Sequence, residues 1–80
     1  MTKKTDPRLI QFGNHVRNLR EKKGLSQDEV STNSEKLSKA TISDIERGKR
    51  NAATTTLIDL AKGLKVHPKE ILNFDITDEG

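Results

Sequence analysis

The segment SQDEVSTNSEKLSKATISDIERGKR, residues 26–50, contains the signals for two short helices. Ser26 and Glu29 have the spacing of a capping box, in which a hydroxyl and a carboxylate satisfy the free backbone amides at a helix start. Ser38 has the position of an N-cap for a second helix. The residues between the two helices are polar, so the segment predicts helix, turn and helix.

The second of these helices is apolar on one side only. Ile42 and Ile45 are one turn apart and form a face to be buried, and Gly48 supplies the left-handed residue on which many helices end. Small, polar and charged side chains point elsewhere, and a basic segment, residues 47–51, follows. Two short helices with a polar turn form a helix-turn-helix. An outer face of this kind suits a helix that enters the major groove of DNA.

A longer helix is predicted before this pair. It begins at Pro7, with Asp6 as N-cap, and ends at Gly24. Its apolar residues recur with helical spacing at Leu9, Phe12, Val16 and Leu19. Gly13 lies inside this helix, where glycine costs about 1 kcal/mol relative to alanine. We therefore expect either close packing at Gly13 or a weak point in the helix.

Two further helices are predicted after the basic segment. The fourth covers about residues 54–64, with one apolar face formed by Leu57, Leu60, Ala61 and Leu64. A short fifth helix begins at Pro68, with His67 as N-cap, and has Ile71 and Leu72 to bury. The sequence therefore predicts an all-α chain of five short helices.

Composition restricts the class of protein. Eighty residues allow one domain with a small core, and with two aromatic residues that core must be aliphatic. The absence of cysteine excludes disulfides and thiolate metal sites. No apolar run reaches membrane-spanning length and residues 1–7 lack a signal peptide, so we expect a cytoplasmic protein. We expect a disordered arm over residues 1–6, a folded domain over residues 7–74 and an acidic tail over residues 75–80.

The net charge of +3 is unevenly distributed. All 15 basic residues lie at or before Lys69, together with 8 acidic residues, which gives +7; the last 4 acidic residues then contribute −4. A basic body suits a polyanionic partner such as nucleic acid, although many small proteins carry a similar excess. Charge alone is therefore a weak argument for DNA.

Three segments together resemble a known family. FGNHVRNLREKKGLSQDEV, KATISDIERGKRN and TLIDLAKGLKVHPKEIL are similar to the phage-repressor-like, Cro-type (XRE) helix-turn-helix transcriptional regulators, and the likeness covers about residues 8–73. The resemblance implies a compact five-helix, lambda-repressor-like DNA-binding domain. Its helix-turn-helix would be formed by the second and third helices.

The resemblance also implies roles for individual residues. Base edges would be read by Lys39, Ala40, Thr41, Ser43 and Asp44. Phosphates would be held at the start of the second helix and after the third, by Ser26, Gln27, Arg47, Lys49, Arg50 and Asn51. Arg20 and Glu46 would form an ion pair inside the domain. Each assignment has an alternative, since Lys39 could be solvated, Asp44 could pair with Arg47, and Glu46 could be a solvated surface acid.

The chain departs from the family pattern in its turns. The spacing from Val30 to Ile42 is one residue longer than usual, and the turn lacks its usual glycine. Asn33 tolerates the left-handed conformation and could reverse the chain there. Lys65 likewise replaces a glycine that often follows the fourth helix. The angle between the second and third helices, and the depth of Lys39 in the groove, depend on this turn.

The function predicted from these features is a sequence-specific regulator that binds double-stranded DNA and reads a pseudo-palindromic operator as a homodimer. A repressor, an autoregulator and a restriction–modification controller are all consistent with it. The dimer interface would use the apolar surface of the fifth helix and tail, at Ile71, Leu72, Phe74 and Ile76. The alternatives are an antitoxin-like module whose main partner is another protein and a helical packing module with no DNA role.

Catalysis has no support in the sequence. His15 and His67 are not spaced with acids or with each other as metal ligands are. The chain is also too small to offer a sheltered pocket for a nucleophile and its base. We therefore expect no enzyme activity, no metal, no cofactor and no small-molecule ligand.

Overall fold

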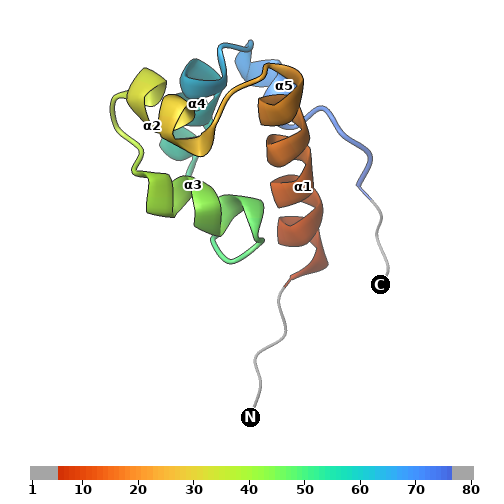
Figure 1. The fold of residues 1–80 in the computed structure, drawn as a ribbon. Helices are drawn as coiled ribbons and strands as arrows, with labels where there is room; N and C mark the ends of the chain where they lie inside the picture. Colours follow the sequence, from red (N-terminus) through yellow and green to blue (C-terminus); the bar gives the residue numbers. More distant parts are fainter. Residues whose placement is uncertain (1–5, 77–80) are drawn as a thin grey trace.

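The computed structural model describes residues 6–76, and within them all regular structure is helical. The helices are α1 (Pro7–Lys22), α2 (Gln27–Ser34), α3 (Lys39–Glu46), α4 (Thr54–Leu64) and α5 (Pro68–Ile71). α3 lies beside α1, while α2 packs against both α4 and α3 (Figure 1). The prediction of five helices in this order is confirmed. The expected N-terminal arm, apart from its last residue, and most of the expected acidic tail lie outside the described residues.

Short side chains start four of the helices as the sequence predicts. Ser26 Oγ accepts from the backbone N–H of Glu29 at 3.0 Å, and a Glu29 carboxylate oxygen accepts from Ser26 N–H at 2.8 Å, which completes the capping box. Asp6 caps α1, Ser38 caps α3 and His67 caps α5 through side-chain acceptors. Ala53 begins α4 without a side-chain cap.

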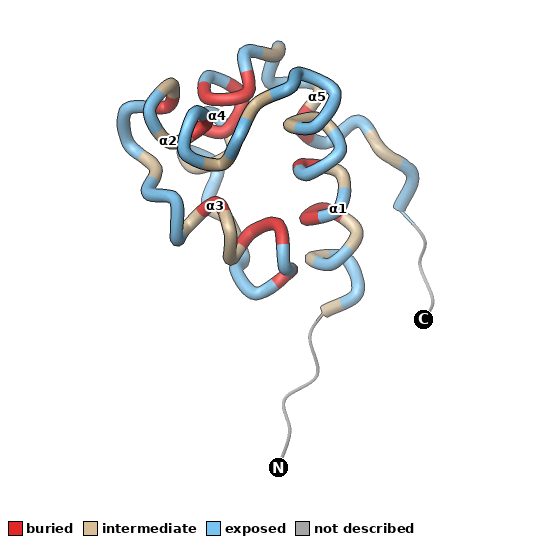
Figure 2. The backbone as a smooth tube through the Cα atoms, in the orientation of Figure 1, coloured by how far each residue is buried: buried red, intermediate tan, exposed pale blue. Residues whose placement is uncertain are grey.

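The core is aliphatic apart from one phenylalanine. Its buried members come from all five helices, and the buried stretches are red along the backbone in Figure 2. They are Phe12, Val16, Val30, Ile42, Ile45, Leu60, Ala61, Leu64 and Ile71. Ile42 and Ile45 are both fully buried, so α3 is fixed by the two residues from which the sequence predicted its inner face.

Two glycines allow helices to touch through their backbones. A Cβ atom on Gly13 would lie 2.4 Å from the carbonyl oxygen of Ile45, and one on Gly63 would lie 2.6 Å from that of Val30. Side chains cannot be accommodated at such distances without a shift of the facing backbone. The close packing expected at Gly13 is therefore confirmed, whereas the contact at Gly63 was not anticipated.

The prediction that Asn33 reverses the chain between α2 and α3 is wrong. The left-handed residue is Glu35, with φ of 67°, and Asn33 is helical. α2 extends through Ser34, whose buried hydroxyl donates to Ser31 O at 2.8 Å and accepts from Leu37 N–H at 3.0 Å. Asn33 instead donates its side-chain amide to Gly63 O at 3.1 Å. These three bonds of Ser34 and Asn33 hold the end of α2 in helical conformation, and the chain reverses at the next residue, Glu35.

One of the four residues predicted for the dimer interface does not lie on the surface. Ile71 is 1% exposed and belongs to the core, while Leu72, which was expected to be buried, is 58% exposed. α5 is a single turn that ends at Ile71, and Leu72 follows it as the C-cap residue. Phe74 is half-buried, and its ring centroid lies 6.2 Å from that of Phe12 and 4.9 Å from that of His15. Ile76 is exposed.

The described part of the chain contains no helix with the length and apolar character needed to cross a bilayer. Residues 6–76 also contain no group of three or more acidic, histidine or cysteine side chains arranged to hold a metal ion.

Candidate nucleic-acid interface

The outer side of α3 presents the side chains predicted to contact bases. Lys39 and Ala40 are exposed, whereas Thr41, Ser43 and Asp44 are partly covered. The hydroxyl of Thr41 lies 3.0 Å from that of the N-cap Ser38, so it already has a partner inside the protein. Because Ile42 and Ile45 fix the inner side, these outer residues keep a defined position relative to the rest of the domain.

The inner side of α3 ends in a carboxylate that is held by two other elements. Glu46 is 5% exposed in its side chain and accepts from Arg20 twice, at 2.7 Å from Nε and 3.1 Å from Nη2. This bidentate contact, through a hydrogen bond to Glu46, raises the pKa of Arg20 above its usual value, against the opposing effect of burial. Arg20 also donates to Leu25 O at 2.9 Å. The ion pair implied by the family resemblance is present and joins α1, α3 and the α1–α2 connection.

Gln27 takes part in the same buried cluster. Its Nε2 donates to a Glu46 oxygen at 3.1 Å, and the residue is partly covered. The sequence assigned Gln27 to a phosphate through its side chain and the backbone amides at the helix start, and in this structure the side-chain amide serves Glu46. What Gln27 can still offer to a phosphate is its backbone N–H at the start of α2, where a helix N-terminus favours anions.

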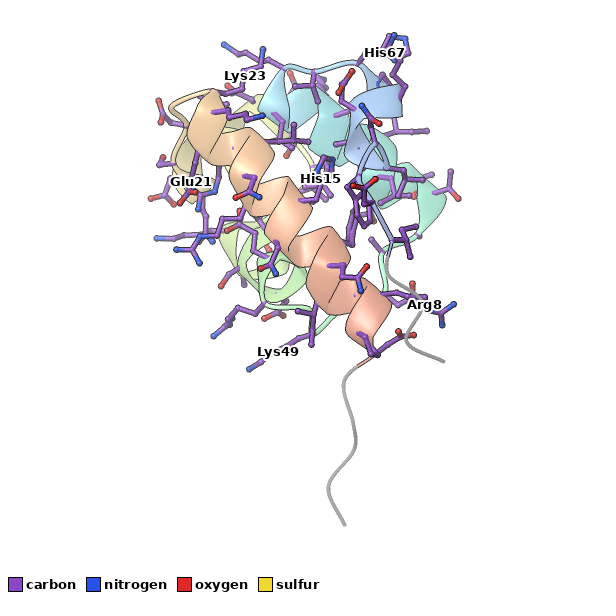
Figure 3. All side chains as sticks on the ribbon, turned by 90° about the vertical axis from the view of Figure 1, so that its right-hand side faces the viewer. Arg8, His15, Glu21, Lys23, Lys49 and His67 are labelled. Carbon is purple, nitrogen blue, oxygen red and sulfur yellow. The ribbon has the colours of Figure 1, made fainter. Side chains whose placement is uncertain are left out.

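A basic loop follows α3. Gly48 has φ of 73°, as predicted for the residue that ends this helix, and Lys49 N–H donates to Asp44 O at 2.9 Å. A Cβ on Gly48 would lie 3.0 Å from the Cα of Ile10, so the loop packs closely on the first half of α1. Arg47, Lys49, Arg50 and Asn51 are exposed. Lys49 and Arg8 project at one end of the molecule and Lys23 and His67 at the other (Figure 3).

Three ion-pair contacts involve side chains that were predicted for the interface. Lys39 Nζ lies 3.6 Å from a carboxylate oxygen of Asp28 on α2, and Asp44 lies 3.2 Å from Arg47 and 3.8 Å from Arg50. Asp28 was missed as an interface residue, because nothing in the sequence relates it to a lysine on the next helix. The Asp44–Arg47 pair is the alternative that the spacing of the two residues had suggested.

The sequence matches a known family. Residues 16–71 match the helix-turn-helix family. The control protein C.BamHI of Bacillus amyloliquefaciens is 39% identical over 64 residues, which cover 79% of this chain and 78% of that protein. The chain therefore belongs to the helix-turn-helix family, as the resemblance in the sequence implied.

Solved structures agree with this assignment. The restriction-modification controller protein C.AhdI from Aeromonas hydrophila superposes with a TM-score of 0.78 at 34% identity, covering 84% of this chain and all 100% of that chain. The restriction-modification controller protein C.Esp1396I, solved as a tetramer in complex with its natural 35 base-pair operator, gives a TM-score of 0.69 at 32% identity and covers 81% of this chain and 95% of that one.

Proposed function

We propose that this protein is a transcriptional regulator that binds double-stranded DNA in a sequence-specific way and reads a pseudo-palindromic operator as a homodimer. The observation that carries the proposal is the geometry of α3, whose inner side is fixed by Ile42, Ile45 and Glu46 while its outer side presents polar residues. Similarity to C.BamHI, C.AhdI and C.Esp1396I favours the restriction–modification controller type. A cytoplasmic location and the lack of enzyme activity are part of this proposal.

Two groups of residues have different tasks in it. The exposed cations Arg47, Lys49 and Arg50 and the backbone amides at the start of α2 hold phosphates, and so supply affinity for any DNA. Lys39, with Ser43 and Asp44 one turn further along α3, faces base edges and supplies selectivity. The assignment of Lys39 to a base is the most specific of these. Its contact with Asp28 is a single exposed ion pair of 3.6 Å, and a guanine can take the place of Asp28 as the partner of Lys39.

Selection of binding sites from a random DNA pool, followed by affinity measurements on every single-base variant, tests the proposal. We expect Lys39→Ala to relax preference at one base pair per half-site, because a good base contact is worth about 1–3 kcal/mol of discrimination. Arg50→Ala should weaken binding to selected and random DNA alike and make the salt dependence about one unit shallower. If no sequence is enriched from the pool, the chain is not a sequence-specific regulator.

Three of the four residues that the sequence assigned to the dimer interface remain available for it. Ile71 is buried, but Leu72, Phe74 and Ile76 line a groove of about 210 Å³. The other residues that line this groove are Arg8, Leu9, Phe12, Asn51, Ala52 and Leu57. An exposed apolar groove of this kind suits a second copy of the chain, because one domain of this size has few base contacts and gains specificity by pairing.

Sedimentation of the double variant Leu72→Asp, Ile76→Asp tests this interface. Both side chains are 58% exposed, so the variant should fold and should sediment as a monomer with weakened operator binding. Ile58→Asp is the matched control, since Ile58 is 53% exposed on α4 but does not line the groove. A dimer that survives the double substitution uses another surface. A wild-type protein that sediments as a monomer and binds no selected DNA supports the antitoxin-like alternative instead.

A further inference from the structure

Asp44 is contacted by two cations that the proposed function assigns to phosphates. Arg47 Nη2 lies 3.2 Å from Oδ1 of Asp44, and Arg50 Nη2 lies 3.8 Å from Oδ2. Each carboxylate oxygen therefore has its own guanidinium. Within residues 6–76, neither arginine has an ion pair with any other acid. The three side chains form one cluster between the outer side of α3 and the basic loop.

This cluster opposes binding to an arbitrary duplex. Two arginines and one carboxylate carry a single net positive charge where the arginines alone would carry two. A duplex offers phosphates at every position, and those phosphates compete with Asp44 for the same guanidinium groups while its own negative charge is repelled. This competition and repulsion weaken binding to every DNA sequence. The weakening is offset only where a base presents a hydrogen-bond donor to the carboxylate, as cytosine N4 does in the major groove.

We propose that Asp44 is a positioning residue that restrains Arg47 and Arg50 in the free protein and thereby lowers the affinity for DNA of random sequence. This inference rests on the proposed function and deepens it, because it assigns discrimination to an acid that acts through two phosphate-binding cations. Asp44 thus raises the ratio of operator binding to random binding without contributing to the affinity for phosphates.

The ion pair between Lys39 and Asp28, on the same surface, restrains its cation less than Asp44 does. Lys39 meets Asp28 through one contact of 3.6 Å, and the two side chains are 60% and 73% exposed. Asp44, in contrast, is 35% exposed and bridges two cations. Water screens the first pair more strongly, so the restraint is concentrated at Asp44.

Affinity for a random duplex, measured over a range of salt concentrations for wild type and Asp44→Asn, tests the inference. Asparagine keeps the shape and removes the charge. We expect random-duplex affinity to rise by about three- to tenfold and the salt dependence to steepen by about one unit, because the freed arginines then neutralise phosphates. Glu21→Gln is the matched control: it removes the acid of an exposed ion pair of 3.4 Å with Arg17 on α1 and should change neither quantity beyond a small electrostatic effect.

The same substitution in an Arg47→Ala, Arg50→Ala background separates action through the arginines from direct repulsion. If Asp44 acts through them, the gain in that background falls to less than half of the gain in the wild-type background. An equal gain in both backgrounds, or a loss of random-duplex affinity in Asp44→Asn, overturns the inference. Failure of the proposed function is distinguishable, because the wild-type protein would then enrich no sequence from the random pool.

Discussion

Glu46 and Asp44 are carboxylates on the same short helix, yet they belong to different regions of the molecule. Glu46 faces inward with a 5% exposed side chain and accepts from Arg20 and Gln27, which lie on α1 and α2. Asp44 faces outward, and its partners Arg47 and Arg50 follow it directly in the chain. The inward carboxylate joins three helices, whereas the outward one only arranges side chains on a surface. The two sides of α3 therefore separate the requirements of folding from those of binding.

The largest effect is expected on the inner side, from Glu46→Gln. It leaves the Arg20 guanidinium, 15% exposed, without its counter-charge, and breaking a buried pair from one side costs about 3 kcal/mol or more. The free energy of unfolding, measured by urea denaturation, should fall by that amount. Arg20→Met should also destabilise, and the double variant should lose much less than the sum of the two. Additive losses would mean two independent surface charges and would remove the contrast with Asp44.

The next effect is expected where α1 meets the end of α3. Gly13→Ala places a Cβ 2.4 Å from the carbonyl oxygen of Ile45 and 2.6 Å from that of Glu46, so the helices must separate. We expect a loss of about 2 kcal/mol, within the range for overpacked sites and larger than the gain in helix propensity. Asn14→Ala is the control, because Asn14 is exposed on the same helix and should change stability little. Equal stability of the two variants would contradict backbone contact at this point.

A smaller effect, of opposite sign, is expected in the connections. Lys65 is the exposed C-cap of α4 and has φ of 60°, a left-handed backbone conformation that a residue with a Cβ atom disfavours. Lys65→Gly should raise the free energy of unfolding by about 0.5–1 kcal/mol. Lys65→Ala removes the side chain without relieving the conformation and should give no gain. If alanine stabilises as much as glycine, the cost lies in the lysine side chain and not in the backbone.

The smallest effect on stability is expected on the outer side, from Asp44→Asn. Exposed ion pairs contribute about 0–1 kcal/mol, so the thermal midpoint should stay close to that of the wild type. The same variant should nevertheless change DNA affinity, as argued above. A loss of stability comparable to that of Glu46→Gln would place Asp44 in the folding cluster and would abolish the separation between the two sides of α3.

The sequence by itself determined which residues begin and end most of the helices and which apolar residues form the core faces. Ser26, Ser38 and His67 cap as predicted because an N-cap depends on amides within three residues of it. Gly48 ends α3 and Gly13 permits close packing for equally local reasons, because the absence of a Cβ atom follows from the residue type alone. The family resemblance supplied the Arg20–Glu46 pair, for which the spacing alone gives no signal.

Only the tertiary structure decided the partners of polar side chains and the orientation of short segments. Gln27 contacts Glu46 and Asp28 contacts Lys39 because the packing of α2 against α3 brings these side chains together. Ile71 is buried and Leu72 is exposed because α5 has a single turn, too short for a periodic pattern to fix its face. Glu35, and not the conformationally permissive Asn33, is left-handed because long-range hydrogen bonding to Gly63 keeps Asn33 in the helix. Each of these outcomes depends on contacts across the fold, which local preference cannot encode.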